Sequence, residues 1–195
     1  MPICQNLINP FAEPNARESG VNTLEERVLL VNRQDEVIGI EDKMRAHLLG
    51  TLHRAFSVFV INSAGKLLLQ RRAATKYHSR NLWSNTCCGH PRPEETIARA
   101  SRRRLREEMG LELNLKEVFS FVYRANLEDG LIENEYNHVL VGVFEGVPKP
   151  DPAEISEWRW VDLQEVSGDL KKNPANYTYW FRISFDRFLR VLLAI

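Results

Sequence analysis

The chain has 195 residues, of which 44% are hydrophobic and 27% are charged, as in an ordinary soluble globular protein. Lys plus Arg and Asp plus Glu each total 26, and the resulting net charge of zero argues against nucleic-acid binding by bulk electrostatics. No apolar run of about 18 residues exists, so no membrane span is expected. The chain has three cysteines, two of which, Cys87 and Cys88, are adjacent, and such a set does not make a disulfide framework. This favours a reducing compartment, and we expect the cytoplasm.

Residues 1–24 have neither the basic start nor the apolar stretch of a secretory signal, and we expect a loosely ordered N-terminal extension there. Residues 25–195 are long enough for a single domain with its own core, ending in a helix. No apolar stripe is left without an expected partner in this domain, so a monomer is the expectation.

Seven segments have the alternating or continuously apolar pattern of strands: Glu26–Arg33, Glu36–Glu41, Ala55–Ile61, Lys66–Arg72, Glu117–Ala125, Glu135–Phe144 and Glu157–Val161. The turn at residues 62–65 predicts a β-hairpin between the third and fourth of them. Strands mixed with a few helices indicate an α+β or mixed α/β domain built on a mixed sheet.

Two helices are predicted. The first spans Thr96–Met109, and Gly110 follows where a glycine with positive φ would end it. Its narrow apolar stripe consists of Ile97, Ala98, Ser101, Leu105 and Met109. The second, Tyr177–Ile195, is amphipathic, with an apolar side made of Phe181, Phe185, Phe188, Leu189 and Leu192.

The segment Gly89–Leu111, GHPRPEETIARASRRRLREEMGL, resembles the Nudix box. That box is glycine, five residues, glutamate, seven residues, Arg-Glu, an apolar residue, any residue, Glu-Glu, any residue, glycine and an apolar residue. The spacing is matched over 23 positions by Gly89, Glu95, Arg103, Leu105, Glu107, Glu108, Gly110 and Leu111. The resemblance implies a Nudix fold, with mixed sheets flanked by helices. Carboxylates one turn from arginines can hold a divalent ion and a diphosphate together, whereas an isolated RRRLREE run is more often a solvated helix.

One position departs from the box. Arg104 stands where the box has a glutamate that helps a hydrolase to collect metal ions for attack on phosphorus. A cation there weakens such chemistry and adds a donor for a diphosphate oxygen. Arg104 and Glu108 are four residues apart and share a helix face. The helix is therefore interpreted as holding a diphosphate rather than breaking it.

Other segments narrow the resemblance further. NLWSNTCCGHP precedes the box, ENE occupies residues 133–135, and HRAFSVF is followed by LLLQRR. Together with the altered box they are similar to type I isopentenyl-diphosphate isomerases, which have the Nudix fold, over most of the chain from Glu26. Where many members have an aromatic-Pro-Gly turn, this chain has Ser79-Arg80-Asn81, which affects the expected geometry of the pocket entrance.

Glu133 and Glu135 point the same way on a strand, and two like charges on one strand face are costly unless a cation lies between them. With three histidines they would make a five-ligand site suited to Mg²⁺, Mn²⁺ or Zn²⁺ rather than closed tetrahedral zinc. The resemblance implies that the ligands are His47, His53, His90, Glu133 and Glu135. The stretch between His47 and His53 is expected to be a loop. Taken alone, any of these histidines is more often a hydrogen-bonded or surface residue.

The resemblance also implies the reaction and the roles of further residues. An alkene carbon of isopentenyl diphosphate accepts a proton and the neighbouring carbon loses one, giving dimethylallyl diphosphate. Cys88 and Glu135 lie on opposite sides of the five-carbon unit and Tyr123 relays a proton. Trp180 stabilises the developing cation, with core packing as its alternative role. The diphosphate is held by Lys43, Arg72, Lys76 and Arg104, and by Mg²⁺ bound to Glu108 and the Cys88 carbonyl oxygen.

Two other functions remain open from the sequence. A Nudix hydrolase would account for the box but not for Arg104, the NTCCGHP segment or the ENE triplet. A binding module without catalysis would not need Cys88, Tyr123 and Glu135 together. The flavin-dependent type II isomerase is a longer TIM-barrel enzyme and is excluded by size and pattern. The two remaining histidines, His78 and His138, are interpreted as structural.

Overall fold

The computed structural model describes residues 27–192. Its elements are β1 (Arg27–Val31), β2 (Val37–Asp42), α1 (Lys43–Leu49), β3 (His53–Ile61), β4 (Leu67–Arg72), β5 (Trp83–Ser84), β6 (Cys87–Gly89), α2 (Ile97–Met109), β7 (Lys116–Asn126), β8 (Ile132–Val143), β9 (Ile155–Val161), α3 (Leu163–Lys172) and α4 (Tyr179–Leu192), with short 3₁₀ turns at Glu128–Gly130 and Pro174–Asn176. The extension expected at residues 1–24 lies outside the described residues. Within them, no helix has both the length and the apolar character needed to cross a membrane.

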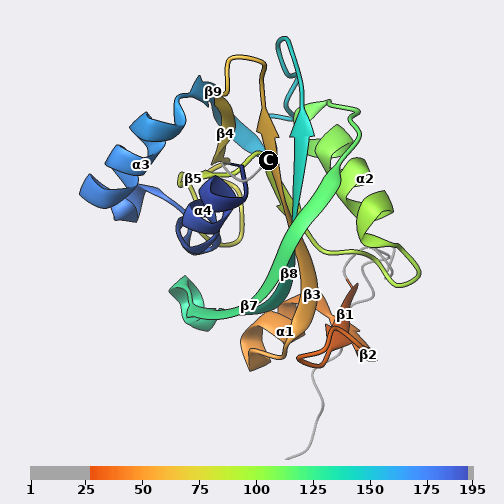
Figure 1. The fold of residues 1–195 in the computed structure, drawn as a ribbon. Helices are drawn as coiled ribbons and strands as arrows, with labels where there is room; N and C mark the ends of the chain where they lie inside the picture. The colour runs from red at the N-terminus through yellow and green to blue at the C-terminus, as the bar shows by residue number, and fades with distance from the viewer. Residues whose placement is uncertain (1–26, 193–195) are drawn as a thin grey trace, which may run out of the picture.

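The sheet is mixed, as the sequence predicts, and β3 is its central strand (Figure 1). It runs parallel to β8 along its whole length, from His53 opposite Glu135 to Ile61 opposite Val143. It also pairs antiparallel with β1 and with β6, while β7 pairs with β8 and β9 with β4. Functional side chains on β3, β6, β7 and β8 are thereby brought into neighbouring rows.

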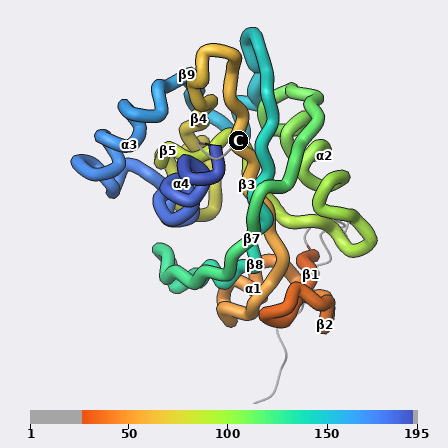
Figure 2. The backbone as a smooth tube through the Cα atoms, viewed as in Figure 1, coloured from red at the N-terminus to blue at the C-terminus, as the bar shows by residue number. Residues whose placement is uncertain are grey.

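Helices cover both faces of this sheet, with α2 on one side and α3 and α4 on the other (Figures 1 and 2). Successive residues of β3 alternate between two cores: Phe56, Val58 and Val60 pack with α2, and Phe59 packs with α4. Because both faces are buried, the strand is apolar at consecutive positions, which explains its unbroken hydrophobic sequence.

The predicted hairpin forms only at its turn. Ile61 pairs with Leu67, and beyond that point β3 and β4 separate. Thr86 occupies the space between them: its hydroxyl accepts a hydrogen bond from the Val60 amide at 2.9 Å and donates one to the Leu68 carbonyl at 2.7 Å. The NTCC segment is therefore inserted into the sheet, and it brings Cys88 next to β3.

Helix α2 confirms the expected span. Thr96 caps its start by accepting from the Arg99 amide, and Gly110 ends it at φ 66°. The predicted stripe is wrong at Ala98, which is exposed, whereas Ala100 and Glu108 are buried. The face that meets the sheet follows the four-residue rows 100–104–108 and 101–105–109, and Ala98 lies off both.

Helix α4 has the predicted amphipathic character within Tyr179–Leu192. Phe181, Phe185 and Phe188 are fully buried, and the Phe188 ring stacks on Phe59 with centroids 4.4 Å apart. These aromatic side chains fix the start of the helix, so Trp180 is held beneath the cavity described below.

Two helices and two short strands, α1, α3, β5 and β6, were not predicted. One of them shortens the loop expected between His47 and His53: His47 lies on α1, which ends at Leu49, and the loop is confined to residues 50–52. Asp42 caps α1 by accepting from the Arg45 amide at 2.9 Å, and Gly50 ends it at φ 62°. A seven-residue helix is too short for its periodicity to be recognised, although its caps were present in the sequence.

Apolar side chains are exposed on β2 and α1: Val37, Ile38, Ile40, Met44, Leu48 and Leu49 are 40 to 66% accessible. The expectation of a monomer rested on there being no such unpartnered surface, so that reason no longer holds. The described residues contain nothing that covers this face.

Candidate active site

Three neighbouring strands place the central carboxylate. Glu135 of β8 lies opposite His53 in the parallel pairing with β3 and opposite Tyr123 in the antiparallel pairing with β7. The Tyr123 hydroxyl donates a hydrogen bond of 2.7 Å to Glu135 Oε2, and Asn137 Nδ2 donates another of 3.0 Å to the same oxygen. One oxygen of Glu135 is thus oriented by neutral donors, while Oε1 faces the histidines.

Four of the five expected metal ligands converge, and the fifth, Glu133, lies beside them in a second group of possible ligand atoms with His47 and His78. Nε2 of His90 is 3.1 Å and Nε2 of His53 is 3.9 Å from Glu135 Oε1. On the other side of the cluster, His47 Nε2 is 3.4 Å from Glu133 Oε2. The ligand atoms of His47, His53, His90 and Glu135 all lie within 4.8 Å of one another. All of these side chains except His90 are buried, and His90 is only partly exposed.

Hydrogen bonds to two of the histidines orient their rings so that they can bind a cation. Nδ1 of His47 contacts the Lys43 carbonyl at 2.6 Å, and Nδ1 of His53 contacts the Thr51 carbonyl at 2.8 Å. A carbonyl can only accept, so each Nδ1 carries a hydrogen and each Nε2 presents a lone pair to the cluster. His47 Nε2, His53 Nε2 and Glu133 Oε2 are buried without a hydrogen-bond partner. Such orphaned atoms are costly, and a divalent ion among them would satisfy all three.

The surroundings of Glu133 and Glu135 shift the pKa values of these two carboxylates in opposite directions. Burial, followed by the neighbouring charge of Glu135, raises the pKa of Glu133 to about 7. Burial also acts to raise the pKa of Glu135, but the hydrogen bond from His90 and the nearby histidines outweigh it and lower that pKa. Two buried carboxylates so close together strongly favour a positive ion between them.

Cys88 lies on β6, directly opposite Ser57 of β3. Its thiol donates to Asn85 Oδ1 at 3.2 Å and lies 3.7 Å from the Ser57 hydroxyl. Asn85 is fixed in turn because its Nδ2 donates to the carbonyls of Val58 and Cys87. Burial, and secondly the charge of Glu108, raises the pKa of Cys88 to about 12, so the thiol keeps its proton. Cys87 points away into the core beside α2.

The four basic residues expected to bind diphosphate line the same cavity. Burial, and then the positive charges of Lys76 and Arg104, lowers the pKa of Lys43 to about 8. Lys76 forms a close ion pair with Glu154, and the Arg72 guanidinium lies over the Trp180 ring, 5.3 Å from its centroid. Cations crowded around one cavity, at a cost in pKa to one of them, indicate an anion site. Lys76 and Arg104, which both pair with Glu154, mark the basic end of the cavity.

Arg104, the departure from the Nudix box, reaches this end of the cavity from α2. Its guanidinium contacts Glu107 at 2.8 Å, Glu108 at 2.5 Å and Glu154 at 3.2 Å. Glu108 also accepts a hydrogen bond from Gln70 Nε2 at 3.2 Å. Arg104 is therefore held among three carboxylates with its charge directed into the cavity.

Glu95 and Arg103, two further box residues, form a structural pair. Nε and Nη2 of Arg103 each donate a 2.7 Å hydrogen bond to one oxygen of Glu95, which also accepts from the Arg92 amide at 3.0 Å. This two-point contact ties the loop after β6 to α2. Arg103 also lines the cavity, so the contact holds part of the cavity wall in place.

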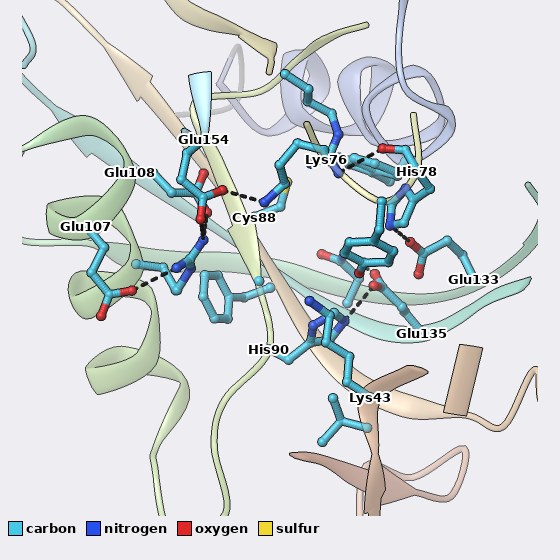
Figure 3. Close-up of a pocket in the computed structure, with 18 of the residues that line it drawn as sticks. Lys43, Lys76, His78, Cys88, His90, Glu107, Glu108, Glu133, Glu135 and Glu154 are labelled. Atoms are coloured by element: carbon cyan, nitrogen blue, oxygen red, sulfur yellow. Dashed lines mark hydrogen bonds and ion pairs between the residues drawn. The ribbon is translucent and has the colours of Figure 1, made fainter. Parts of the chain in front are cut away.

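The cavity measures about 430 Å³ and joins the two groups of residues. Figure 3 shows Glu107, Glu108 and Glu154 gathered on one side and Glu133, Glu135 and His90 on the other, with Cys88 between them in this view. Trp180, which the sequence left between core packing and a site role, is 4% exposed, lines the cavity and donates to the Ser84 hydroxyl at 3.0 Å. It has both roles.

Sequence reasoning missed several cavity residues, among them Glu154 and His78. Glu154 precedes β9 and pairs with both Lys76 and Arg104. His78, interpreted as structural, lies 3.3 Å from Glu133 and is buried. Neither has a local pattern that marks it, because their partners are distant in sequence. His138, by contrast, lies between Asp35 and Glu117 away from the cavity, as a structural residue would.

Comparison with known proteins identifies the class first. A model of the NUDIX domain matches residues 51–181, and the chain belongs to the Nudix family. The fold agrees with a Deinococcus radiodurans protein of known structure (TM-score 0.71, 23% identity, 83% of this chain and 98% of that one) and with a MutT protein from Methanosarcina mazei (TM-score 0.59, 20% identity, 71% and 94%). The predicted Nudix fold is thus confirmed.

Closer relatives identify the branch of this family. An isopentenyl-diphosphate Delta-isomerase of Aromatoleum aromaticum is 54% identical, over 85% of this chain and 94% of its own length. Proteins of the same name from Burkholderia multivorans and Serratia proteamaculans are 53% and 47% identical, over 84% and 81% of this chain and 93% and 88% of theirs. The chain belongs to the isopentenyl-diphosphate Delta-isomerases, as its sequence motifs predict.

Proposed function

We propose that the chain interconverts isopentenyl diphosphate and dimethylallyl diphosphate by protonation and deprotonation at this cavity, as a step in isoprenoid precursor biosynthesis. The observation that carries the proposal is that a free thiol, a buried carboxylate for proton transfer and four cationic side chains line one cavity. Free thiols at Cys87 and Cys88 suit the reducing cytoplasm, where we expect the enzyme to act on a small-molecule substrate.

The basic end binds the diphosphate. Lys43, Arg72, Lys76 and Arg104 supply charge-assisted hydrogen bonds to its oxygens. Glu108 and the Cys88 backbone carbonyl would hold a Mg²⁺ ion that would neutralise diphosphate charge, since Mg²⁺ prefers oxygen ligands and often shares them with phosphate. Remote binding of this kind fixes the alkene in the middle of the cavity, where its position relative to the proton-transfer groups determines the rate.

Cys88 and Glu135 transfer the protons from opposite sides of the five-carbon unit. Tyr123 takes part through its 2.7 Å hydrogen bond to Glu135, by which the phenol donates to the carboxylate that exchanges a proton with the substrate. Trp180 offers the face of its ring to the tertiary cation that forms in between. Substrate that fills this cavity would displace water, which would otherwise capture this cation.

A divalent ion, Mn²⁺, Mg²⁺ or Zn²⁺, would be held by His47, His53, His90, Glu133 and Glu135. The buried, partnerless nitrogen and oxygen atoms of this group support such a site. When bound, the ion would fix the orientation of Glu135 and stabilise its negative charge. Glu135 Oε2, which accepts from Tyr123, remains available for proton exchange.

Incubation with isopentenyl diphosphate and Mg²⁺ in deuterated water tests the proposal. We expect dimethylallyl diphosphate that carries deuterium, and no release of phosphate. Phosphate release from this or a nucleotide substrate without isotope exchange would mean that the cavity performs hydrolysis. Binding of the diphosphate with neither activity, in folded metal-loaded protein, would assign the chain to the non-catalytic binding modules.

A further inference from the structure

His78 occupies a position that connects the parts of the cavity. It lies in the loop between β4 and β5, where the chain departs from the aromatic-Pro-Gly turn of many relatives. Its ring is 3% exposed and packs edge-on against Trp180, with centroids 5.7 Å apart. Its backbone carbonyl accepts a 3.1 Å hydrogen bond from Arg72 Nη2. The loop is thus attached to the basic end while the imidazole points to the carboxylates, as Figure 3 shows for His78 and Glu133.

The two oxygens of Glu133 have different surroundings. Oε1 is 3.3 Å from His78 Nε2. Oε2 is 3.4 Å from His47 Nε2, and both atoms of this second pair are buried without a hydrogen-bond partner. Oε2 is therefore the oxygen that a cation would satisfy, whereas Oε1 has the imidazole of His78 beside it at ion-pair distance.

We propose that His78 is a positioning residue of the metal centre, which holds Glu133 by Oε1 so that only Oε2 is presented to the ion. This inference rests on the proposed metal site and extends it by a residue on a different loop. His78 Nδ1 lies 3.2 Å from the Ser79 hydroxyl, which can donate to it. The neutral ring then carries its hydrogen on Nε2, directed at Glu133.

The physical reason is geometric. A glutamate side chain can bind a metal through one oxygen or through both, and a donor on one oxygen selects the first mode. With two carboxylates and three imidazoles around one ion, one-oxygen binding by Glu133 leaves space for all five. His78 would therefore raise the affinity of the site without contacting the ion.

The affinity for Mn²⁺ alone tests this role. Free Mn²⁺ is measured by electron paramagnetic resonance in chelator-treated protein, without substrate. His78→Leu fills the space but has no donor, and His78→Asn is polar but too short to reach Glu133. We expect both to weaken Mn²⁺ binding by roughly 10- to 100-fold. His78→Gln, whose amide reaches about as far as Nε2, should restore most of the affinity.

A matched control is His138→Gln, which alters a histidine between two carboxylates outside the cavity and should leave Mn²⁺ affinity unchanged. Equal affinity of wild type, His78→Leu and His78→Asn would overturn the inference while leaving the metal site intact. Equal weakening by Asn and Gln would show a packing role instead. If His78→Leu does not fold, the Asn and Gln pair decides alone. If wild-type protein binds no Mn²⁺ and still isomerises its substrate, the proposed metal site is wrong, and so is this role of His78.

Discussion

Tyr123 lies directly opposite Glu135 across the β7–β8 pairing, and its hydroxyl donates a 2.7 Å hydrogen bond to Glu135 Oε2. Burial, and then the charge of Glu135, raises the pKa of this phenol well above its ordinary value, so it acts as a donor and not as an anion. A carboxylate that faces histidines with one oxygen and a phenol with the other can be fixed in place and still exchange a proton.

Tyr123→Phe should therefore lower kcat on the order of 10²-fold, with KM for isopentenyl diphosphate almost unchanged. The ring remains to fill the space, and only the hydroxyl is lost. Steady-state kinetics measure the effect. The control is Tyr136→Phe. Tyr136 follows Glu135 on β8, and its hydroxyl accepts a hydrogen bond from Ser120 and not from a cavity residue. A rise in KM alone would mean that Tyr123 shapes the cavity and takes no part in proton transfer.

Cys88→Ala should reduce turnover by about 10²- to 10⁴-fold in protein that stays folded, because no other group near Asn85 and Ser57 can replace the thiol. Deuterium incorporation into substrate and product measures each proton transfer separately. Cys87→Ala is the matched control, since Cys87 packs in the core beside α2 and should affect stability more than rate. Wild-type turnover in Cys88→Ala would remove this thiol from the mechanism.

Arg104→Gln tests the basic end of the cavity. Loss of a charge-assisted hydrogen bond to a diphosphate oxygen costs about 1.5 to 3 kcal/mol, which corresponds to a rise in KM of roughly 10- to 100-fold. Arg102→Gln, on the exposed side of the same helix, should have no such effect. An unchanged KM in Arg104→Gln would mean that Arg104 does not bind the diphosphate and serves only through its contacts with Glu108 and Glu154.

Metal removal should lower the melting temperature. An ion present at 100 times its Kd stabilises the folded state by about 2.7 kcal/mol, equivalent to about 5 to 10 °C for a chain of this size. Calorimetric scans with a chelator, and again after metal is restored, measure the shift. Glu133→Gln should show a smaller response because it lacks one charged ligand. Identical melting with and without metal would count against the five-residue site.

Glu95 provides a test of pH dependence outside the cavity. The hydrogen bonds from Arg103 lower the pKa of Glu95 from its ordinary 4.5, so the folded chain binds fewer protons there than the unfolded chain. The stabilisation is complete above pH of about 4.5 and is lost as the pH falls through the lower pKa of the folded state. Glu95→Gln should thus reduce the free energy of unfolding by about 1.5 to 3 kcal/mol at pH 7, and by less at acid pH.

Urea unfolding at both pH values checks this effect, with the exposed Glu94→Gln as the neighbouring control. A loss of stability in Glu95→Gln that stays constant with pH would assign the contribution of residue 95 to shape and not to charge.

Much of this molecule is determined locally and was therefore accessible from the sequence. Helix α2 has its cap at Thr96, its terminator at Gly110 and carboxylates at fixed spacing, all within one segment. Glu133 and Glu135 share a strand face because side chains alternate along a strand. The family motifs point to Cys88 and to the expected metal ligands, because each motif is a short run of fixed internal spacing.

Other features depend on contacts between segments far apart in the chain, and only the tertiary structure decided them. Thr86 separates β3 from β4, His47 belongs to a short helix, and Glu154 reaches Lys76 and Arg104 across the cavity. His78 and His138 look alike in sequence, yet one meets Glu133 and the other meets Asp35. The pairing of strands and the packing of loops set these distances, and no local spacing contains that information.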